Sequence, residues 1–354
     1  MANAITTRGG IVAYEQTAST WGTLVAPTTL DQILITGGLP LSENREVTPD
    51  QAAGWSWNQY THLGKKDLDF TLNMPLRYGS RIWSFVAQIM GTDTKTGSAD
   101  PYTHTMALLD AIDGLDNFGS LCAQLGPAAG ELLMEWPSVK PYGFTISGPN
   151  GQGFVDLSVK LRANKMNMGA DCTVTTGNFD SVTHETIDSV LAPMVPFGAL
   201  RFRMNGQTGA ALGASDNLAL KSFSFSFNRK IDAEWVNRQA YASQWETAEP
   251  IEDGIPESNL QIVLGDYNAL TYMEAFQDST EQKAEFYFAL DADHDIKLEF
   301  PRLKFNNPEA SISGQGRIPQ TLKFDPLLAS AAPTGMTLTN WGLIVRTENA
   351  TAYE

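Results

Sequence analysis

Alternation of apolar and polar residues over short segments limits most strongly how this chain can fold. Residues 221–231, KSFSFSFNRKI, place Phe223, Phe225 and Phe227 on one face of an extended segment and serine on the other. A period of two residues fits a half-buried β-strand and not a helix. Further segments of this kind are DLDFTLNM, GFTISG, FVDLSVKLRA, GALRFRMN, NLQIVLG, AEFYFAL, DIKLEF, TLKF and MTLTNWGLIV. The sequence therefore predicts a mainly β protein.

Helical periodicity is confined to two segments. Residues 78–91, YGSRIWSFVAQIMG, gather apolar side chains on one broad stripe and end at Gly91, a residue that favours a helix end. Residues 266–277, DYNALTYMEAFQ, form the second candidate. Many strands with two short helices predict β-sandwiches or barrels that carry a helix on the flank.

Short phrases recur in the same order in the two halves of the chain. LSENREV is echoed by FSFNRKI, and MEWPSVK is echoed by LEFPRLK, with a strand and a helix candidate between the two phrases in each half. Chance likeness of alternating strands explains any one echo, but several in one order favour an internal duplication. The repeated positions are Asn44, Arg45, Glu135 and Pro137 in the first half, and Asn228, Arg229, Glu299 and Pro301 in the second.

The duplication predicts a division of the chain into two tandem modules. We expect an N-terminal arm over 1–27, a first module over 28–165, a polar connector over 166–195, a second module over 196–326, and a C-terminal strand and tail over 327–354. Each module should be a β-sandwich or barrel with one flanking short α-helix. The repeated proline should start or end a strand at the same place in both modules, because proline cannot donate to a central ladder.

A polar stretch with several aromatic residues follows each Asn-Arg pair. Clustered Trp and Tyr in such a stretch are typical of interface anchors, since they combine a large apolar area with a polar handle. Packing of these rings on the core of their own module is the alternative. The residues are Trp55, Trp57 and Tyr60 in the first half, and Trp235, Tyr241 and Trp245 in the second.

Charge and cysteine content narrow the class of protein further. The net charge of −16 argues against a nucleic-acid binder, whose affinity comes largely from Lys and Arg. Two cysteines, Cys122 and Cys172, do not make a disulfide framework, so we expect reduced thiols. The chain has neither an apolar run long enough for a membrane helix nor the apolar core of a signal peptide, so we expect synthesis in a cytoplasm.

No segment carries the pattern of an enzyme, a metal site or a cofactor site. The four histidines show no ligand spacing. DADHD, residues 291–295, alternates carboxylates as a calcium loop does, but Ile296 and Arg302 stand where that loop needs glycine and glutamate, so a hairpin turn is expected. GPNGQG is followed by a strand rather than a helix and cannot cradle a phosphate.

Several segments resemble the tail tube proteins, or major tail proteins, of long-tailed bacteriophages. They are AYEQTASTWGT (residues 13–23), IMGTD with PYTHTM (89–106), PFGALRFRMN (196–205) and the two Ser-x-Asn-Arg strands. The resemblance implies modules that are β-sandwiches with a flanking helix. It implies that the inner sheets of six modules close into a ring around a channel, and that rings stack through a long loop. The aromatic stretches after Arg45 and Arg229 look like that inter-ring stacking loop.

The resemblance also implies partners and a location. With two modules in each chain, three chains would complete a ring, giving a trimer with pseudo-sixfold symmetry. The tube would let the tape measure protein and double-stranded DNA pass through a negatively charged lumen without tight binding, unless the charge serves only solubility. It would meet tail tip and terminator proteins, and it would belong to the virion tail after assembly in the host cytoplasm.

Two other classes compete with this interpretation. One is another virion structural protein, such as a decoration or neck protein. The other is a carbohydrate-binding, adhesin-like β-sandwich, because exposed aromatic rings also stack on sugars. An adhesin would normally be secreted, and no signal peptide is found in the sequence.

Overall fold

The structure of the chain is a computed structural model. It describes residues 11–16, 20–25, 31–50, 60–110, 117–126, 132–149, 153–179, 193–232, 246–265, 271–306, 309–310, 320–350 and 352–353.

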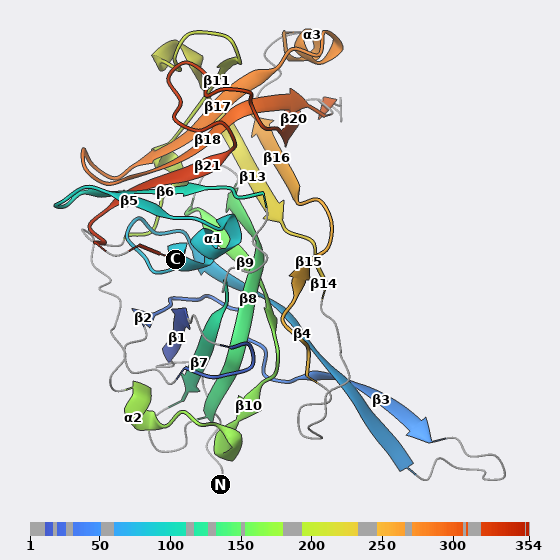
Figure 1. Cartoon of the computed structure of the whole chain (residues 1–354). Coiled ribbons are helices and arrows are strands. Elements are labelled where there is room, and N and C mark those ends of the chain that lie inside the picture. Colours follow the sequence, from blue (N-terminus) through green and yellow to red (C-terminus); the bar gives the residue numbers. More distant parts are fainter. Residues whose placement is uncertain are drawn as a thin grey trace.

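One antiparallel sheet of nineteen strands, counted over the described residues, bends round into two facing layers (Figure 1). Layer A contains strands from both halves of the chain. At one edge, β3 (Asn44–Asp50) extends the layer by pairing with the first residues of β4 (Tyr60–Pro75). Its strands are, in order, β4, β9 (Asp156–Ala163), β8 (Leu132–Gly148), β13 (Leu220–Asn228), β16 (Glu257–Leu264) and β20 (Gln320–Pro326).

Layer B covers layer A and shares the long strand β8 with it. Its strands are β1 (Ile11–Gln16), β7 (Gly119–Leu125) and β10 (Asn167–Met168) beside β8, then β11 (Leu200–Gly206), β17 (Gln282–Ala289), β18 (Asp295–Phe305), β21 (Gly342–Thr347), β6 (Tyr102–Ala107) and β5 (Thr94–Thr96). Shorter strands are β2 (Asp31–Gln32), β12 (Asn217–Leu218) and β19 (Glu309–Ala310), with a separate ribbon of β14 (Ile231–Asp232) and β15 (Ile251–Glu252).

The core lies between the layers and follows from the alternation. Phe223 of β13 packs on Phe286 of β17 with ring centroids 4.8 Å apart, and Phe225 packs on Phe300 of β18 at 5.0 Å. The serines between these phenylalanines lie on the opposite face of layer A and are half-buried. The prediction of a mainly β fold is confirmed.

Both predicted helices are present, and they differ in burial. α1 (Trp83–Met90) is buried along its whole length and ends at Gly91, whose φ of 91° suits glycine at a helix C-terminus. α3 (Thr271–Gln277) has no buried residue. Shorter helical turns are α2 (Thr176–Phe179), η1 (Gly169–Asp171), η2 (Phe197–Ala199) and η3 (Ala214–Asp216). None of the described helices is long and apolar enough to cross a membrane.

The repeated prolines lie inside long strands, so the prediction that they start or end a strand is wrong. Between β7 and β8 the register shifts so that Pro137 and Ser138 together oppose Ser120. Between β17 and β18 it shifts so that Pro301 and Arg302 together oppose Lys283. A β-bulge leaves one residue out of the ladder, and proline is tolerated there because it has no N–H to donate.

The segments expected to flank the two modules take part in the fold. β1, from the expected N-terminal arm, pairs with β7 along its whole length. In the expected connector, Val174 and Phe179 are buried in a small cluster with Ala13 and Cys122. The DADHD turn joins β17 to β18, and the Asp291 side chain accepts hydrogen bonds from the backbone N–H groups of Asp293 and His294, a contact that Asp often makes in turns.

Candidate functional site

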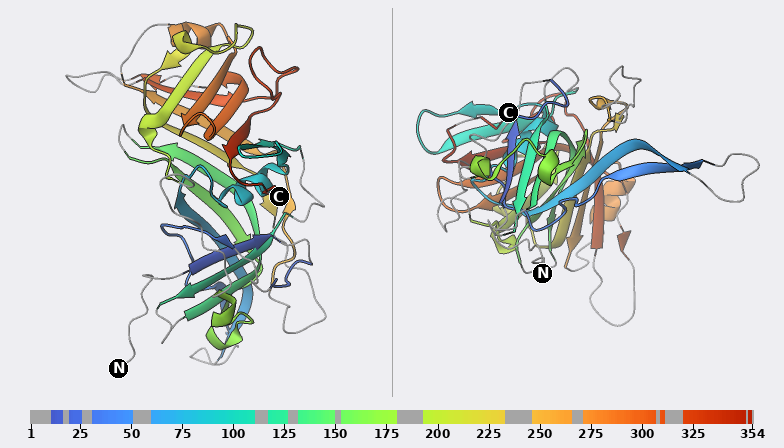
Figure 2. Two further views of the ribbon diagram at one scale, coloured as in Figure 1. Left: turned by 90° about the vertical axis from the view of Figure 1, so that its left-hand side faces the viewer. Right: turned by 90° about the horizontal axis from the view of Figure 1, so that it is seen from below.

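The two halves of the chain meet where β8 pairs with β13. The ladder runs from Phe223 opposite Gly148 to Asn228 opposite Gly143, and it makes layer A continuous from one half to the other (Figures 1 and 2). A second contact between the halves is the pairing of β6 with β21. Within this ladder, the buried side chain of His104 on β6 lies between the Asp93 carboxylate, 2.7 Å away, and the Asn349 carbonyl, 2.9 Å away.

Arg229 is the most heavily bonded side chain of this junction. It is fully buried, and its guanidinium donates to the carbonyl oxygens of Ile89 (2.6 Å) and Leu109 (2.8 Å) and to the Glu252 carboxylate (2.5 Å). Since Ile89 lies in the last turn of α1, an arginine of the second half caps a helix of the first half. The helix C-terminus carries partial negative charge, which favours a cation there.

Asn228, the neighbour of Arg229, crosses the junction on the other face of layer A. Its side chain lies over Gly143, where a Cβ would come within 2.5 Å of the Asn228 Oδ1 atom, and it accepts a hydrogen bond from Lys160 Nζ at 3.4 Å. Only glycine leaves room for this arrangement. Gly143 was not among the positions singled out from the sequence, because a glycine in an alternating strand does not indicate which side chain of a neighbouring strand will lie over it.

Asn44 and Arg45, the first Asn-Arg pair, lie at the free edge of layer A. Asn44 is exposed opposite Asp67, and Arg45 Nε donates to the Gly64 carbonyl at 3.2 Å. Here β3 and the first part of β4 form a hairpin that projects from the body of the molecule (Figures 1 and 2).

Glu135 and Glu299 are both buried and both hold a later segment of the chain. Glu135 accepts hydrogen bonds from Asn167 Nδ2 at 2.6 Å and from the backbone N–H groups of Thr173 at 2.8 Å and Val174 at 3.0 Å. Glu299 accepts from the backbone N–H of Thr337 at 3.1 Å. Pro137 and Pro301 follow these carboxylates at the two bulges.

The aromatic residues expected in stacking loops are largely beyond what the structure describes. Tyr60 begins β4, but its side chain is outside the described set. Trp55, Trp57, Trp235, Tyr241 and Trp245 lie outside the described residues.

The face of layer A that points away from the core is rich in hydroxyl and amide groups. One cross-strand row reads Asn73, Ser158, Thr145, Ser226 and Asn259, with Ser158 Oγ donating to Asn73 Oδ1 at 2.8 Å. Some of its charges pair with each other, as Arg162 does with Asp67 at 2.6 Å. Charges of both signs lie on this face: the carboxylates are Asp67, Asp69, Asp156, Glu257 and Asp325, and the cations are Lys160, Arg162 and Lys323, with Lys230 Nζ 2.7 Å from Glu257 and Lys304 opposite Asp325.

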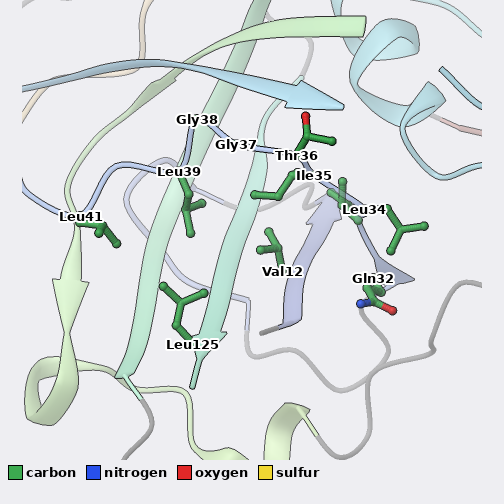
Figure 3. Close-up of a pocket in the computed structure, with 11 residues that line it drawn as sticks. Val12, Gln32, Leu34, Ile35, Thr36, Gly37, Gly38, Leu39, Leu41 and Leu125 are labelled. Carbon is green, nitrogen blue, oxygen red and sulfur yellow. The ribbon is translucent and has the colours of Figure 1, made fainter. Parts of the chain in front are cut away.

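An apolar pocket of about 340 Å³ lies beneath the free edge of layer A, along residues 32–41 (Figure 3). Val12 of β1, Leu125 of β7 and Leu39 gather round it, and Leu41 at its rim is 58% exposed. The residues that line it carry no charge. This pocket suits apolar packing rather than bond-making chemistry.

A charged pocket on layer B holds ion pairs. Arg203 Nη1 lies 2.8 Å from Glu285, Arg346 Nε lies 2.7 Å from Asp295, and the Arg201 guanidinium lies over the Tyr287 ring. These cations are already matched by carboxylates or an aromatic face. Among the described residues, no cluster of His, Cys, Asp and Glu has the arrangement of a metal site.

Both cysteines are free thiols whose surroundings disfavour the thiolate. Cys122 is buried, and burial together with nearby Glu135 raises its pKa far above the ordinary value. Burial, again with Glu135, raises the pKa of Cys172 to about 11. Because the thiolate is the reactive form, neither cysteine suits nucleophilic chemistry near neutral pH.

Comparison with known proteins agrees with the resemblance found in the sequence. A family model described as phage tail tube protein matches residues 7–326, which include both halves of the chain and their junction. The search of curated proteins gave no match. The family match favours the tube interpretation over the decoration, neck and adhesin alternatives.

Proposed function

The chain belongs to the phage tail tube protein family, and from that premise we propose that three copies close into a ring of six modules and that the rings stack into the tail tube. The protein is a structural component of the virion tail. Its finer role in this proposal is to form a conduit through which DNA leaves the virion for the host cell. Assembly takes place in the host cytoplasm before the tail is complete.

The observation that carries the proposal is a strand register that repeats in the two halves. Two residues after the bulge proline of the first half, Val139 pairs with Ala163. At the same distance after Pro301 in the second half, Leu303 pairs with Pro326. A second shift by one residue follows in both halves. It lies between Pro141 and Gly143 on β8 and between Phe305 of β18 and Glu309 of β19.

The same register continues across the next two strands to the Asn-Arg pairs. Phe70 pairs with Leu161 of β9 as Leu260 pairs with the corresponding Phe324 of β20. Three residues before Phe70 and Leu260, Asp67 faces Asn44 and Glu257 faces Asn228. Hydrogen-bond pairing and sequence echo thus match the same residues, which supports two duplicated modules within one chain.

Two neighbouring modules within a chain imply the geometry of the ring. The β8–β13 ladder joins unlike edges of the two modules, so a repeat of this head-to-tail contact continues in one direction and can close. Closure would also cover the free edges of layer A, which would otherwise invite uncontrolled strand pairing. Three chains with two modules each would give a pseudo-sixfold ring.

The open face of layer A would then form the channel wall. Its hydroxyl and amide groups carry no charge, and several of its cations are paired with carboxylates, as Arg162 is with Asp67 and Lys230 is with Glu257, so it attracts the phosphates of double-stranded DNA only weakly. The tape measure protein and the DNA would therefore pass without tight binding. Tail tip and terminator proteins would bind the two ends of the tube.

Ring stacking would use the projecting β3–β4 hairpin and the aromatic stretch that it carries. The ribbon of β14 and β15 is its counterpart in the second module, because Ile231 pairs with Glu252 just beyond Arg229, as Val47 pairs with Leu63 just beyond Arg45. Each ring would then present stacking loops from both modules of every chain.

Negative-stain electron microscopy of the purified full chain tests this function. We expect long tubes of constant diameter with a regular axial repeat. Discrete particles at all protein concentrations would contradict the proposal and would favour a decoration or neck protein.

A further inference from the structure

The contrast between the two helices points to an incomplete interface. α1 and α3 hold the same place in the order of elements along the chain. α1 follows β4 and precedes β7, the strand opposite the Pro137 bulge. α3 follows β16 and precedes β17, the strand opposite the Pro301 bulge. Every residue of α1 is buried, whereas none of α3 is. Phe276 of α3 is 39% exposed, and Gln277 and Asp278 at its C-terminal end are exposed.

What covers the end of α1 comes from the other half of the same chain. Arg229 caps its last turn, and Phe225 on the same strand is fully buried, with its ring 5.9 Å from that of Phe144 on β8. The C-terminal end of α1 is therefore capped by Arg229 of the neighbouring module, while Phe225 of β13 packs beside β8. Among the described residues, α3 has no counterpart of this arginine cap, and its C-terminal end is exposed.

Residues that correspond to Arg229 and Phe225 lie at the free edge of the first half. The repeated register matches Asn44 with Asn228, so Arg45 corresponds to Arg229 and Leu41 to Phe225. Leu41 is 58% exposed, although its counterpart is fully buried. This edge and α3 lie at opposite ends of the molecule, as the two sides of a head-to-tail contact must (Figure 1).

We propose that Arg45 of one copy caps the C-terminal end of α3 in the next copy, and that Leu41 becomes buried in the same contact. The guanidinium would donate to the carbonyl oxygens of Gln277 and Asp278, which correspond to the α1 carbonyls held by Arg229. The partial negative charge of the helix end and the carboxylates of Glu274 and Asp278 favour a cation there. This inference rests on the proposed ring and identifies its contact between chains.

The contact between copies would be smaller than the junction within the chain. The β6–β21 pairing has no counterpart there, because the described part of the second half contains no equivalent of the β5–β6 hairpin. The partner that fits is thus a second copy of this chain. It would be held only by strand pairing along layer A and by the arginine cap. We therefore expect a ring to separate at the contacts between chains more readily than at the junction between the two modules of one chain.

Disulfide trapping tests the contact directly. Arg45→Cys and Gln277→Cys are made as separate single variants in a Cys172→Ser background, with the buried Cys122 retained. When the two are mixed, assembled and oxidised, we expect covalent dimers with one chain of each kind, and none from either variant alone. Mixing Arg45→Cys with Thr271→Cys, at the other end of α3, is the matched control.

Charge reversal gives a second, independent measurement. Arg45→Glu should raise the protein concentration needed for tube assembly by about tenfold or more, with an unchanged circular dichroism spectrum of the monomer. Asp278→Arg in the same chain should restore assembly in part. Lys65→Glu, on the same hairpin, should have little effect.

The outcomes separate this contact from the tube function. Tubes that form while the Arg45 and Gln277 pair cross-links no better than the control would overturn the contact and leave the tube function standing. Unchanged assembly by Arg45→Glu would also overturn it. Failure of the wild-type chain to form rings or tubes at all would instead overturn the proposed function.

Discussion

Glu135 and Glu299 hold corresponding places in the two halves of the chain. Each is a buried carboxylate two residues before the bulge proline, and each accepts the backbone N–H of a threonine 38 residues further on, Thr173 or Thr337. The repeated Glu-aromatic-Pro phrase therefore does two things in each half. The glutamate accepts hydrogen bonds from a later segment of the chain, and the proline lies at a β-bulge.

Glu135→Gln should lower the free energy of unfolding by ~1–3 kcal/mol, measured by urea titration. Both Glu135 oxygens accept hydrogen bonds, so an amide must turn its NH2 group toward a donor. Glu299→Gln should have a smaller effect in the same direction, because its bonds converge on one oxygen. Glu257→Gln, on an exposed side chain, is the control. An unchanged free energy of unfolding for Glu299→Gln would argue against a shared role of the two glutamates.

Arg229→Ala should destabilise the monomer by ~3–5 kcal/mol, because it removes one partner of a buried ion pair and uncaps α1. The Glu252 carboxylate, 10% exposed, would lose the guanidinium. Thermal and urea unfolding measure the loss, and Arg201→Ala, at an exposed arginine, serves as control. Equal stabilities of the two variants would show that Arg229 does not hold the junction.

Gly143→Ala should destabilise the junction, because the new methyl group would meet Asn228 Oδ1 at 2.5 Å and the Phe227 carbonyl at 3.0 Å. Asn228→Ser in the same chain removes the nearer atom and should recover part of the loss. The melting temperatures of the two single variants and the double variant measure this coupling. Strictly additive effects would contradict the close approach.

Local patterns in the sequence were sufficient to predict many of these elements. Phe223, Phe225 and Phe227 identified β13, because a period of two residues is a local property. Gly91 identified the end of α1. Residues 166–195 looked like a polar connector because Val174 and Phe179 are isolated apolar residues with no period, although both are buried.

Long-range contacts could not be predicted from the sequence. That Arg229 would meet the carbonyls of α1, about 140 residues earlier, depends on the pairing of β8 with β13. The phrase around Pro137 was expected at a strand boundary, because a bulge inside a strand has no reliable local signal. Glu135 was chosen as a repeated residue, but its buried bonds follow only from the fold.

His294 should make the stability of the folded chain depend on pH, because its ring lies 3.0 Å from the Asp291 carboxylate of its own turn and 3.6 Å from Asp100 of the first half. Burial lowers the pKa of His294, but the hydrogen bond to Asp291 and the carboxylates of Asp100 and Glu348 raise it, and the net pKa is above 6.5. A raised folded-state pKa means that the contribution to stability is full below 6.5 and is lost as pH rises through the folded value.

The size of that contribution should be up to ~1 kcal/mol, as for a partly exposed ion pair. The measurement is the difference in unfolding free energy between wild type and His294→Gln at about pH 5.5 and about pH 8.5. A difference that does not shrink at the higher pH would contradict the assigned role.

Trp55→Ala and Trp235→Ala should each leave a folded chain that stacks poorly. A buried aromatic anchor can contribute ~2 kcal/mol or more to an interface, and a tube repeats the loss at every ring. Sedimentation measures polymer formation, and circular dichroism checks the fold. Normal polymerisation would mean that these stretches do not stack the rings, and an unfolded chain would place the tryptophans in the core.

A cryo-electron microscopy reconstruction of the tube, processed without imposed rotational symmetry, tests the central claim most directly. We predict three chains in each ring, with Asp69, Asp156 and Glu257 facing the channel. Alternate positions around the ring should differ at the β5–β6 hairpin of the first half, which has no equivalent among the described residues of the second. Six chains in each ring would mean that only one module of each chain lines the channel, which would contradict the pseudo-sixfold ring.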